Sequence, residues 1–195
     1  MFLAQRPSRP AITRFLLESR ELPLSYAPIG LVRTQASRRG MDDALFVIGR
    51  GQADFERARA ALLALRHFNI GWVEAFPQGT PITVGTVFAV LIRHLGFWSL
   101  NGCRVLYTVG SPEDGTHFGV GHGTLTNHAE SGEELCEVFL DPQTEDVLYH
   151  IRAMSWPRAM LARIGHPIAR WLQARFRRHS AEAMRRAVAE NSRAR

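Results

Sequence analysis

HFGVGHGTLTNHAESGEELCEVFLDPQTEDVLYHIRAM, residues 117–154, contains three strand-like runs, at 117–125, 133–140 and 147–154. Residues that favour turns, namely Asp, Asn, Pro and Gly, separate the three runs. The connection at 141–146 is too short for a helical crossover, so neighbouring strands are expected to run antiparallel. This stretch therefore predicts an antiparallel meander.

Three more runs upstream extend the meander to six strands. They lie at 70–76, 82–92 and 102–110, again with turn-forming residues between them. The segment 111–115 is typical of a hairpin loop.

The part of the chain before the meander predicts two helices and a strand. Residues 44–49 predict a buried strand. A short helix is expected at 11–20, and an extended stretch at 26–33 after Pro23. A second helix is indicated by apolar residues at three- and four-residue spacing, which are Phe55, Ala58, Leu62 and Leu65.

A long C-terminal helix is expected to begin with Pro157 at its first position. Gly165 and Pro167 should kink or restart it, because proline lacks the amide donor that a helix interior needs. One stripe of this helix is predicted to face the sheet, and it consists of Leu161, Ile168, Leu172, Phe176, His179, Ala183 and Ala187.

The order of these elements predicts an α+β fold in which a curved antiparallel meander wraps around the C-terminal helix. This is the helix-grip arrangement of START and Bet v 1-like proteins, which hold a cavity between sheet and helix. A cystatin-like sheet and a simpler α+β sheet are the alternatives. The expected organisation is an N-terminal extension at 1–21, one domain at 22–190 and a frayed tail at 191–195.

Composition excludes several classes of protein. Hydrophobic residues form 46% and charged residues 22% of the 195 residues, which is usual for a folded domain. No apolar run reaches the roughly 20 residues that cross a bilayer, and the N-terminus has no secretory signal. Cys103 and Cys136 lie far apart without CxxC spacing, so neither a disulfide framework nor a metal is predicted. A cytoplasmic location is expected.

All 24 basic residues are arginine, and ten of them follow residue 154. An anionic membrane surface or a nucleic acid could bind such a charged helix. A solvated helix face explains it more simply, and no nucleic-acid-binding motif accompanies it, so no nucleic-acid partner is predicted. The arginines on the polar side of the helix are Arg163, Arg170, Arg177, Arg178 and Arg185.

The segment 122–134 concentrates the chemistry of the chain, with two histidines and three glutamates. Its spacing matches no zinc signature. Glu134 shares a strand face with Cys136 and Val138, so it is predicted to point into the cavity. A carboxylate there needs a partner or a shifted pKa. The alternative is a structural salt bridge with Arg104 or Arg152.

Two polar and aromatic groups are further candidates for a ligand site, although core packing and hairpin capping also explain them. One combines Trp98, Asn101 and Arg104, and the other combines Tyr149 and Arg152. Gly119, Gly121 and Gly123 alternate along one predicted strand, where they favour a bend or the close approach of a ligand or another backbone. The predicted ligand-binding residues are Asn101, Arg104, Thr124, Glu134, Tyr149 and Arg152.

Several stretches together resemble a known family, the domain of unknown function numbered nineteen-ninety, found in actinobacterial and plant proteins. The chain departs from the expected pattern at His122, where we expect an aromatic residue such as Tyr. The resemblance implies a fold but no reaction. The similar stretches are LSYAPIG at 24–30, GRGQADF at 49–55, FWSLNGCR at 97–104, GTL at 123–125, HAESGEE at 128–134 and YHIRAMS at 149–155.

The leading functional prediction is binding of a small, mostly apolar molecule between sheet and C-terminal helix, without a cofactor. One alternative is an enzyme of hydrolase, cyclase or lyase type that uses His128 and Glu134 as acid and base. Another is an interaction module that uses the arginine-rich helix, with peripheral contact to an anionic membrane. The sequence makes no prediction of the oligomeric state.

Overall fold

The computed structural model describes residues 1–33, 40–79, 81–94, 96–110, 115–157 and 166–190. Within these residues, eight strands form one sheet. The strands are β1 (Phe2–Leu3), β2 (Asp42–Arg50), β3 (Val73–Phe76), β4 (Val87–Arg93), β5 (Trp98–Val109), β6 (His117–Thr124), β7 (Glu130–Leu140) and β8 (Asp146–Pro157). The helices are α1 (Arg9–Ser19), α2 (Gly51–Leu63), the 3-10 helix η1 (Arg66–Phe68) and α4 (His166–Glu190).

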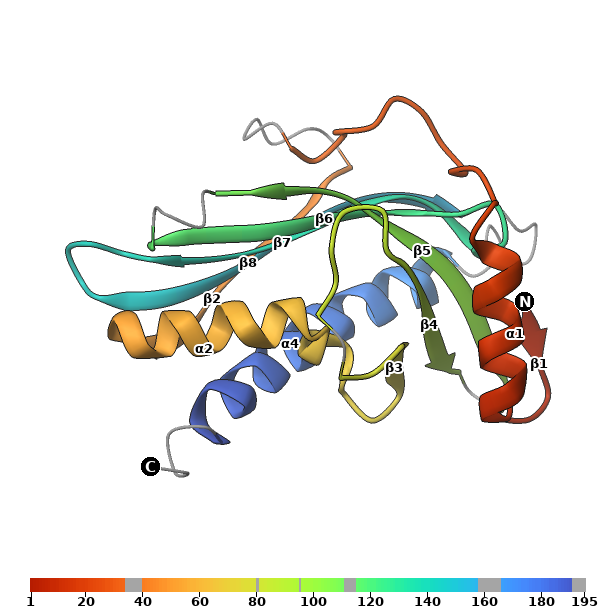
Figure 1. The fold of residues 1–195 in the computed structure, drawn as a ribbon, viewed down its shortest axis with the longest axis horizontal. Coiled ribbons are helices and arrows are strands. Elements are labelled where there is room, and N and C mark those ends of the chain that lie inside the picture. Colours follow the sequence, from red (N-terminus) through yellow and green to blue (C-terminus); the bar gives the residue numbers. More distant parts are fainter. Residues whose placement is uncertain (34–39, 80, 95, 111–114, 158–165, 191–195) are drawn as a thin grey trace.

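The sheet has the strand order β2-β8-β7-β6-β5-β4-β3, and β1 pairs with β5. Every pairing is antiparallel, so the predicted six-stranded meander is confirmed. Figure 1 shows the sheet arching over α2 and α4, which lie together on its concave side. This is the predicted helix-grip α+β fold.

Different helices cover the two faces of the sheet. On the concave face, α2, η1 and α4 enclose one apolar core, in which Phe55, Phe88 and Met184 are fully buried. On the convex face, α1 packs Ile12 and Phe15 against β4 and β5. The sheet is therefore covered on both sides, which is why its central strands are almost continuously buried.

The first helix forms close to where its sequence predicts it. Ser8 caps α1 by accepting a hydrogen bond from the amide of Ala11, and a proline occupies its first turn, where the missing amide proton costs nothing. Its buried side chains recur at three- and four-residue spacing, at Ile12, Phe15 and Ser19. That stripe fixes the side of α1 that faces the sheet.

Two predictions for the N-terminal part are wrong. The stretch 26–33 forms bends and a turn instead of an extended strand, because Tyr26 and the amide of Gly30 bond to the carboxylate of Glu133 and not to a neighbouring strand. The strand β2 is present but only half-buried. Its side chains Leu45 and Val47 are 52% and 47% exposed, because helices cover only one face of this edge strand.

The prediction that Pro157 begins the last helix is also wrong. Pro157 ends β8, where it pairs with Glu130, and α4 begins at His166. Pro167 then lies in the first turn of α4, where a helix tolerates proline. The predicted positions Leu161, Arg163 and Gly165 lie outside the described residues, as does the tail at 191–195.

The buried stripe of α4 was predicted in part. Phe176 packs against the core, and Ala183 and Ala187 are buried, as expected. His179 lies at the edge, where its Nδ1 accepts a hydrogen bond from Trp72 at 3.1 Å. From residue 171 onward, the other buried positions of α4 are Ser180, Ala181, Met184 and Val188.

The alternating glycines of β6 make room for two tyrosine rings on the convex face. A Cβ atom on Gly121 would lie 2.3 Å from the ring of Tyr107, and one on Gly123 would lie 2.5 Å from the hydroxyl of Tyr26. The close approach at Gly121 and Gly123 is therefore made by side chains of the protein itself, which reach across the glycines to Glu133, and not by the predicted ligand or backbone.

Replacing Gly121 by alanine should displace the Tyr107 ring and break its hydrogen bond to Glu133. We expect a loss of about 2 kcal/mol in the free energy of unfolding, measured by urea titration. In a Tyr107→Ala background the same change should cost much less, because the clash is gone. Equal costs in the two backgrounds would show that the ring does not require this glycine.

Candidate functional site

Four ionisable side chains meet inside the concave face of the sheet. Glu134 and Cys136 stand two residues apart on β7, so strand alternation directs both toward the helices. His122 of β6 is the register partner of Glu134. The fourth, His67, comes from η1, which follows a left-handed residue, Leu65, at the end of α2. The fold thus brings together side chains from η1, β6 and β7.

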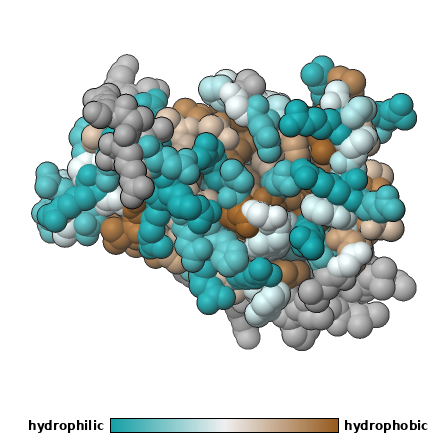
Figure 2. All heavy atoms as spheres, turned by 90° about the horizontal axis from the view of Figure 1, so that it is seen from below, coloured by the Kyte–Doolittle hydropathy of each residue, from teal (hydrophilic) through white to brown (hydrophobic). Residues whose placement is uncertain are grey.

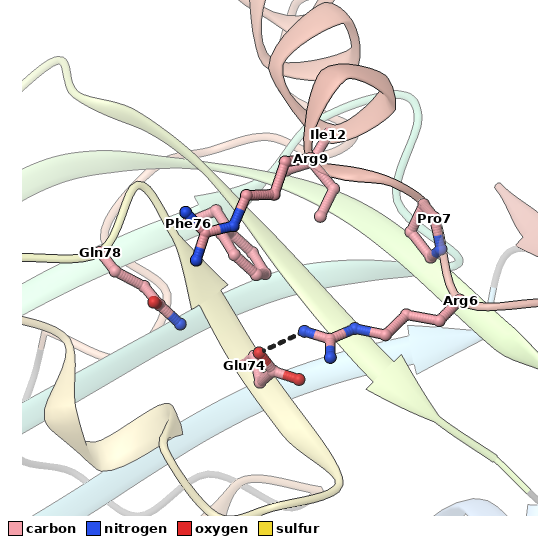
Figure 3. Close-up of a pocket in the computed structure, with 7 residues that line it drawn as sticks. All are labelled: Arg6, Pro7, Arg9, Ile12, Glu74, Phe76 and Gln78. Carbon is pink, nitrogen blue, oxygen red and sulfur yellow. Dashed lines mark hydrogen bonds and ion pairs between the residues drawn. The ribbon is translucent and has the colours of Figure 1, made fainter.

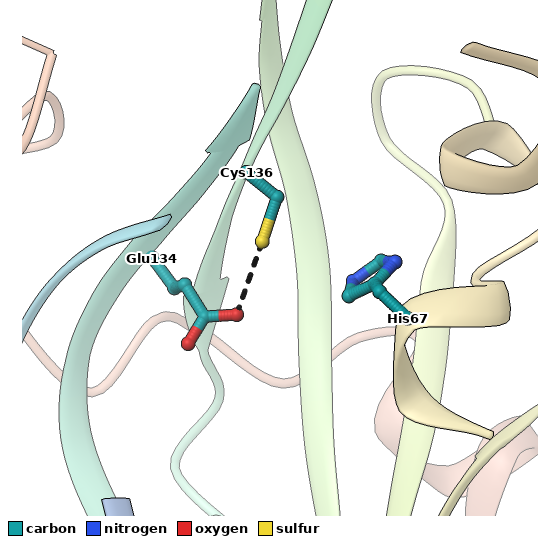
Figure 4. A group of neighbouring side chains, drawn as sticks. All are labelled: His67, Glu134 and Cys136. Carbon is teal, nitrogen blue, oxygen red and sulfur yellow. Dashed lines mark hydrogen bonds between the residues drawn. The ribbon is translucent and has the colours of Figure 1, made fainter. Parts of the chain in front are cut away.

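The distances within this group are short. The Cys136 Sγ atom lies 3.4 Å from Glu134 Oε1, and His122 Nε2 lies 3.8 Å from the same oxygen. The potential ligand atoms of His67, Glu134 and Cys136 all lie within 4.8 Å of one another. Figure 4 shows the His67 ring directed toward the other two side chains. These residues have the donor types and the proximity needed to hold a metal ion.

An apolar and hydrogen-bonding shell surrounds the group. Tyr149 of β8 donates to Cys136 Sγ at 3.4 Å, and its hydroxyl shares a hydrogen bond of 2.9 Å with Ser180 of α4. The rings of Phe88 and Phe68 stand edge-on to His122 at centroid distances of 5.2 and 5.9 Å. Water is largely excluded here, so electrostatic interactions are strengthened.

Burial shifts the pKa of each member of the group in the direction that favours its neutral form. It lowers the pKa of His67 to about 3 and that of His122 to about 4. It raises the pKa of Glu134 to about 7, against the opposing effects of the Cys136 hydrogen bond and the charge of Arg177. At neutral pH both imidazoles are therefore neutral, and Glu134 alone of the four gains or loses a proton readily.

The side of Glu134 nearer to α4 is polar. Arg177 of α4 pairs with Asp42 of β2 at 2.8 Å. Beside them, Ser155 of β8 joins Glu130 of β7 and Gln173 of α4 through hydrogen bonds of 3.1 and 3.2 Å. The Glu134 side chain keeps 19% of its surface exposed. The surroundings of the group are therefore apolar toward the interior of the sheet and polar along α4.

Glu134 and Tyr149 are the predicted site residues that the structure brings together, through Cys136. Arg104 and Arg152 lie on the convex face. Arg104 donates to the carbonyls of Arg20 and Leu22, and Arg152 pairs with Glu137 at 2.6 Å. Strand alternation separates these arginines from Glu134, so the suggested salt bridge between them is wrong.

The other predicted site residues serve local structure. Asn101 Nδ2 donates to Val90 O and Ser99 Oγ, and its Oδ1 accepts from the amide of Ala129. Thr124 bonds to Ser25 and to the backbone of Gly132. His128 lies in the turn between β6 and β7, where its Nδ1 accepts from the amide of Glu130 at 2.9 Å. Their roles in ligand binding or catalysis stay predictions.

A second buried carboxylate, Glu133, belongs to the convex face. It accepts hydrogen bonds from Tyr26 at 2.7 Å, Tyr107 at 2.6 Å and the amide of Gly30 at 2.8 Å. These bonds fasten the segment before β2 across the sheet. Tyr26, Tyr107 and His67 were not predicted as site residues from the sequence, because their partners lie far away in the chain and follow no spacing signature.

A shallow hollow opens elsewhere on the surface, between the N-terminal segment and β3. Its volume is about 300 Å³, and the Arg6–Glu74 ion pair of 2.8 Å crosses it. Figure 3 shows this pair across the hollow. None of the predicted site residues lines it; the lining residues are Arg6, Pro7, Arg9, Ile12, Glu74, Phe76 and Gln78.

Several arginines of α4 are engaged within the chain. Arg175 lies between Trp72 and Trp171, at 5.0 and 5.4 Å from their ring centroids. Arg185 donates to Val47 O, and Arg178 is exposed. Figure 2 shows that this side of the molecule is mostly hydrophilic, with small apolar areas between. None of the helices in the described part of the chain combines the length and the hydrophobicity of a membrane span.

The raised pKa of Glu134 predicts how its substitution depends on pH. The folded chain holds this proton more tightly than the unfolded chain, whose pKa is near 4.5, so the contribution of Glu134 to stability is lost as pH rises through about 7. Glu134→Gln removes this loss. Relative to the unmodified chain, its free energy of unfolding should increase by about 3 kcal/mol from pH 4.5 to pH 8.

The measurement is chemical denaturation of both proteins across this pH range. The histidine contributions cancel in the difference, because both proteins contain them. Glu18→Gln, an exposed change on α1, is the matched control and should show no such trend. A pH-independent difference for Glu134→Gln would mean that Glu134 is ionised in the folded chain as readily as in water.

Solved structures with the same fold include two bacterial proteins. A hypothetical protein of Helicobacter pylori aligns over 83% of this chain and 94% of its own, with a TM-score of 0.56 at 9% sequence identity. A Thermus thermophilus protein aligns over 78% of this chain and 99% of its own, with a TM-score of 0.53 at 10% identity. At such identities the likeness shows the fold alone.

Sequence relatives cover almost the whole chain. A UPF0548 protein of Dictyostelium discoideum is 31% identical over 210 residues, which span 98% of this chain and 97% of the relative. A UPF0548 protein of Deinococcus radiodurans is 33% identical over 203 residues, or 96% and 99% of the two chains. The family profile described as "Domain of unknown function (DUF1990)" matches residues 25–183, which confirms the predicted resemblance. The chain belongs to this family.

Proposed function

We propose that the chain binds a small, mostly apolar molecule between the concave face of the sheet and α4, with the polar group of the ligand at Glu134 and His122. The observation that carries this proposal is the half-buried Glu134 carboxyl, which lies between the apolar interior of the sheet and the polar margin along α4. Among the described residues its hydrogen-bond partner is the Cys136 thiol, a weak donor. Burying a carboxyl this way costs several kcal/mol unless a better partner is supplied.

The chemistry of the cluster indicates what kind of ligand group fits. With a pKa of about 7, Glu134 is present both as acid and as carboxylate near neutral pH. It can therefore accept a hydrogen bond from a hydroxyl or amine, or donate one to a carbonyl. Neutral His122 adds a second donor or acceptor beside it. The phenylalanine rings around His122 suit an apolar body attached to that group.

A second candidate function is acid-base catalysis of hydrolase, cyclase or lyase type. One observation favours it, because a general acid or base works best when its pKa lies near the working pH, and that of Glu134 is about 7. His128 was the predicted partner of Glu134, and the proximity of His122 makes it a better one. This candidate needs the same ligand site, so ligand binding is tested first.

Native mass spectrometry of freshly purified protein should show one ligand per chain, and its release should be accompanied by binding of an apolar fluorescent probe. Glu134→Gln keeps the shape of the side chain and removes its charge, so it should weaken ligand binding about tenfold or more. Glu133→Gln is the matched control, because it makes the same change one residue away on the opposite face. Equal affinities in both variants, with the fold retained, would contradict the proposed site.

The arginine-rich helix generates a separate prediction. Arg175, Arg177 and Arg185 already have partners within the chain, so we expect no salt-sensitive binding to vesicles rich in anionic lipid or to nucleic acid. Cosedimentation with such vesicles at low and high salt tests this. Binding that weakens with salt, and that charge reversal at Arg170, Arg177 and Arg178 reduces, would support the interaction module instead.

A further inference from the structure

We propose that His67, Glu134 and Cys136 bind a divalent zinc ion and leave its fourth position open to a further ligand. The inference goes beyond the proposed ligand binding and stands without it. It rests on the donor set, on the unmet nitrogens of a buried histidine, on the separations between ligand atoms and on the charge balance of the cluster.

His67 is the first observation. The residue is 2% exposed, and neither of its ring nitrogens has a hydrogen-bond partner among the described residues. A buried polar atom without a hydrogen-bond partner destabilises the folded chain, because it has lost its bond to water. Figure 4 shows the ring directed toward Glu134 and Cys136. A metal ion between the three side chains would engage the nitrogen that faces them, since a neutral imidazole is the form that binds metal.

The separations fit a shared tetrahedral ion. Zinc binds sulfur at about 2.3 Å and oxygen at about 2.0 Å, so the two ligand atoms of one ion lie about 3.5 Å apart. The observed distance from Cys136 Sγ to Glu134 Oε1 is 3.4 Å. His122 Nε2 lies 3.8 Å from the same oxygen. Since the atoms of the trio lie within 4.8 Å of one another, the widest pair must close by no more than about 1.5 Å.

The charges also balance. Zinc binds the thiolate of Cys136 and the carboxylate of Glu134, and their protons leave to solvent, so the double charge of the ion meets two single negative charges. The histidines add no charge. An ion-free thiolate or carboxylate is costly here because the surroundings are apolar, and the neutral metal complex avoids that cost.

The groups around the ligands match those that support a metal. Tyr149 donates to the Cys136 sulfur and is itself held by Ser180, so the sulfur is oriented by a hydrogen bond from outside the cluster. One sulfur, one nitrogen and one oxygen favour zinc over magnesium or calcium, which prefer oxygen ligands. The ligands come from η1 and β7, which lie far apart in the chain, and this explains why the sequence shows no zinc signature.

The test uses the full chain after treatment with a chelator, and zinc and cobalt(II) ions alone as probes. We expect one zinc per chain, a higher melting temperature with zinc, and a cobalt spectrum with the visible bands of a tetrahedral site and a thiolate-to-cobalt charge-transfer band. Cys136→Ser should weaken zinc binding by at least about 100-fold and abolish the charge-transfer band. Cys103→Ser, at a second buried cysteine outside the trio, is the matched control and should leave both unchanged.

Absence of the charge-transfer band in the unmodified chain would overturn the proposal, whether or not the variants fold. Undiminished zinc binding by Cys136→Ser would do so too. Ligand binding is measured separately in chelated protein with the apolar probe. Probe binding without zinc binding would reject the metal site and keep the proposed function, and the reverse result would reject the proposed function alone.

Discussion

The alternation of side chains along β7 places neighbouring residues on opposite faces of the sheet. It sends Glu133 and Glu134, adjacent in the chain, to opposite faces of a sheet that is covered on both sides. A shift of one residue in the pairing of β7 would exchange them. Glu133 would then enter the apolar core without its three donors, and Glu134 would meet the tyrosines that now bind its neighbour. The register of this strand therefore fixes the positions of both carboxylates, the one in the structural network and the one in the candidate site.

The two carboxylates show how burial alone does not define a site. Glu133 is 2% exposed, yet two phenolic hydroxyls and a backbone amide satisfy it, which leaves it no capacity for a ligand. Glu134 is less buried but has only a thiol as its hydrogen-bond donor among the described residues. Unmet hydrogen-bonding capacity in an apolar setting, and not depth, distinguishes the candidate site from the structural network.

The sequence allowed the meander and the facing of Glu134 to be predicted because both follow from short-range periodicity. Short turns impose antiparallel neighbours, and a period of two places Glu134 with Cys136. What escaped prediction depends on contacts between distant segments. Residues 26–33 look extended but are held by Glu133, about one hundred residues later. Likewise, nothing local to Arg104 reveals that it caps the carbonyls at the end of α1. Pairing with β7 carries β8 to Pro157, which local helix-start rules cannot anticipate.

The group of four ionisable side chains on the concave face could not be predicted for the same reason, since it also depends on contacts between distant segments. No sequence motif connects these residues, because they lie far apart in the chain. His122 follows His67 by more than fifty residues, and the pair on β7 begins about ten residues after His122. Their juxtaposition depends on the left-handed turn at Leu65, which ends α2 and directs η1 back over the sheet. An apolar core has no need of two imidazoles, a thiol and a carboxyl at one place, and isosteric apolar residues would pack there at lower cost. Their presence together is therefore better explained by something that binds them than by the stability of the fold.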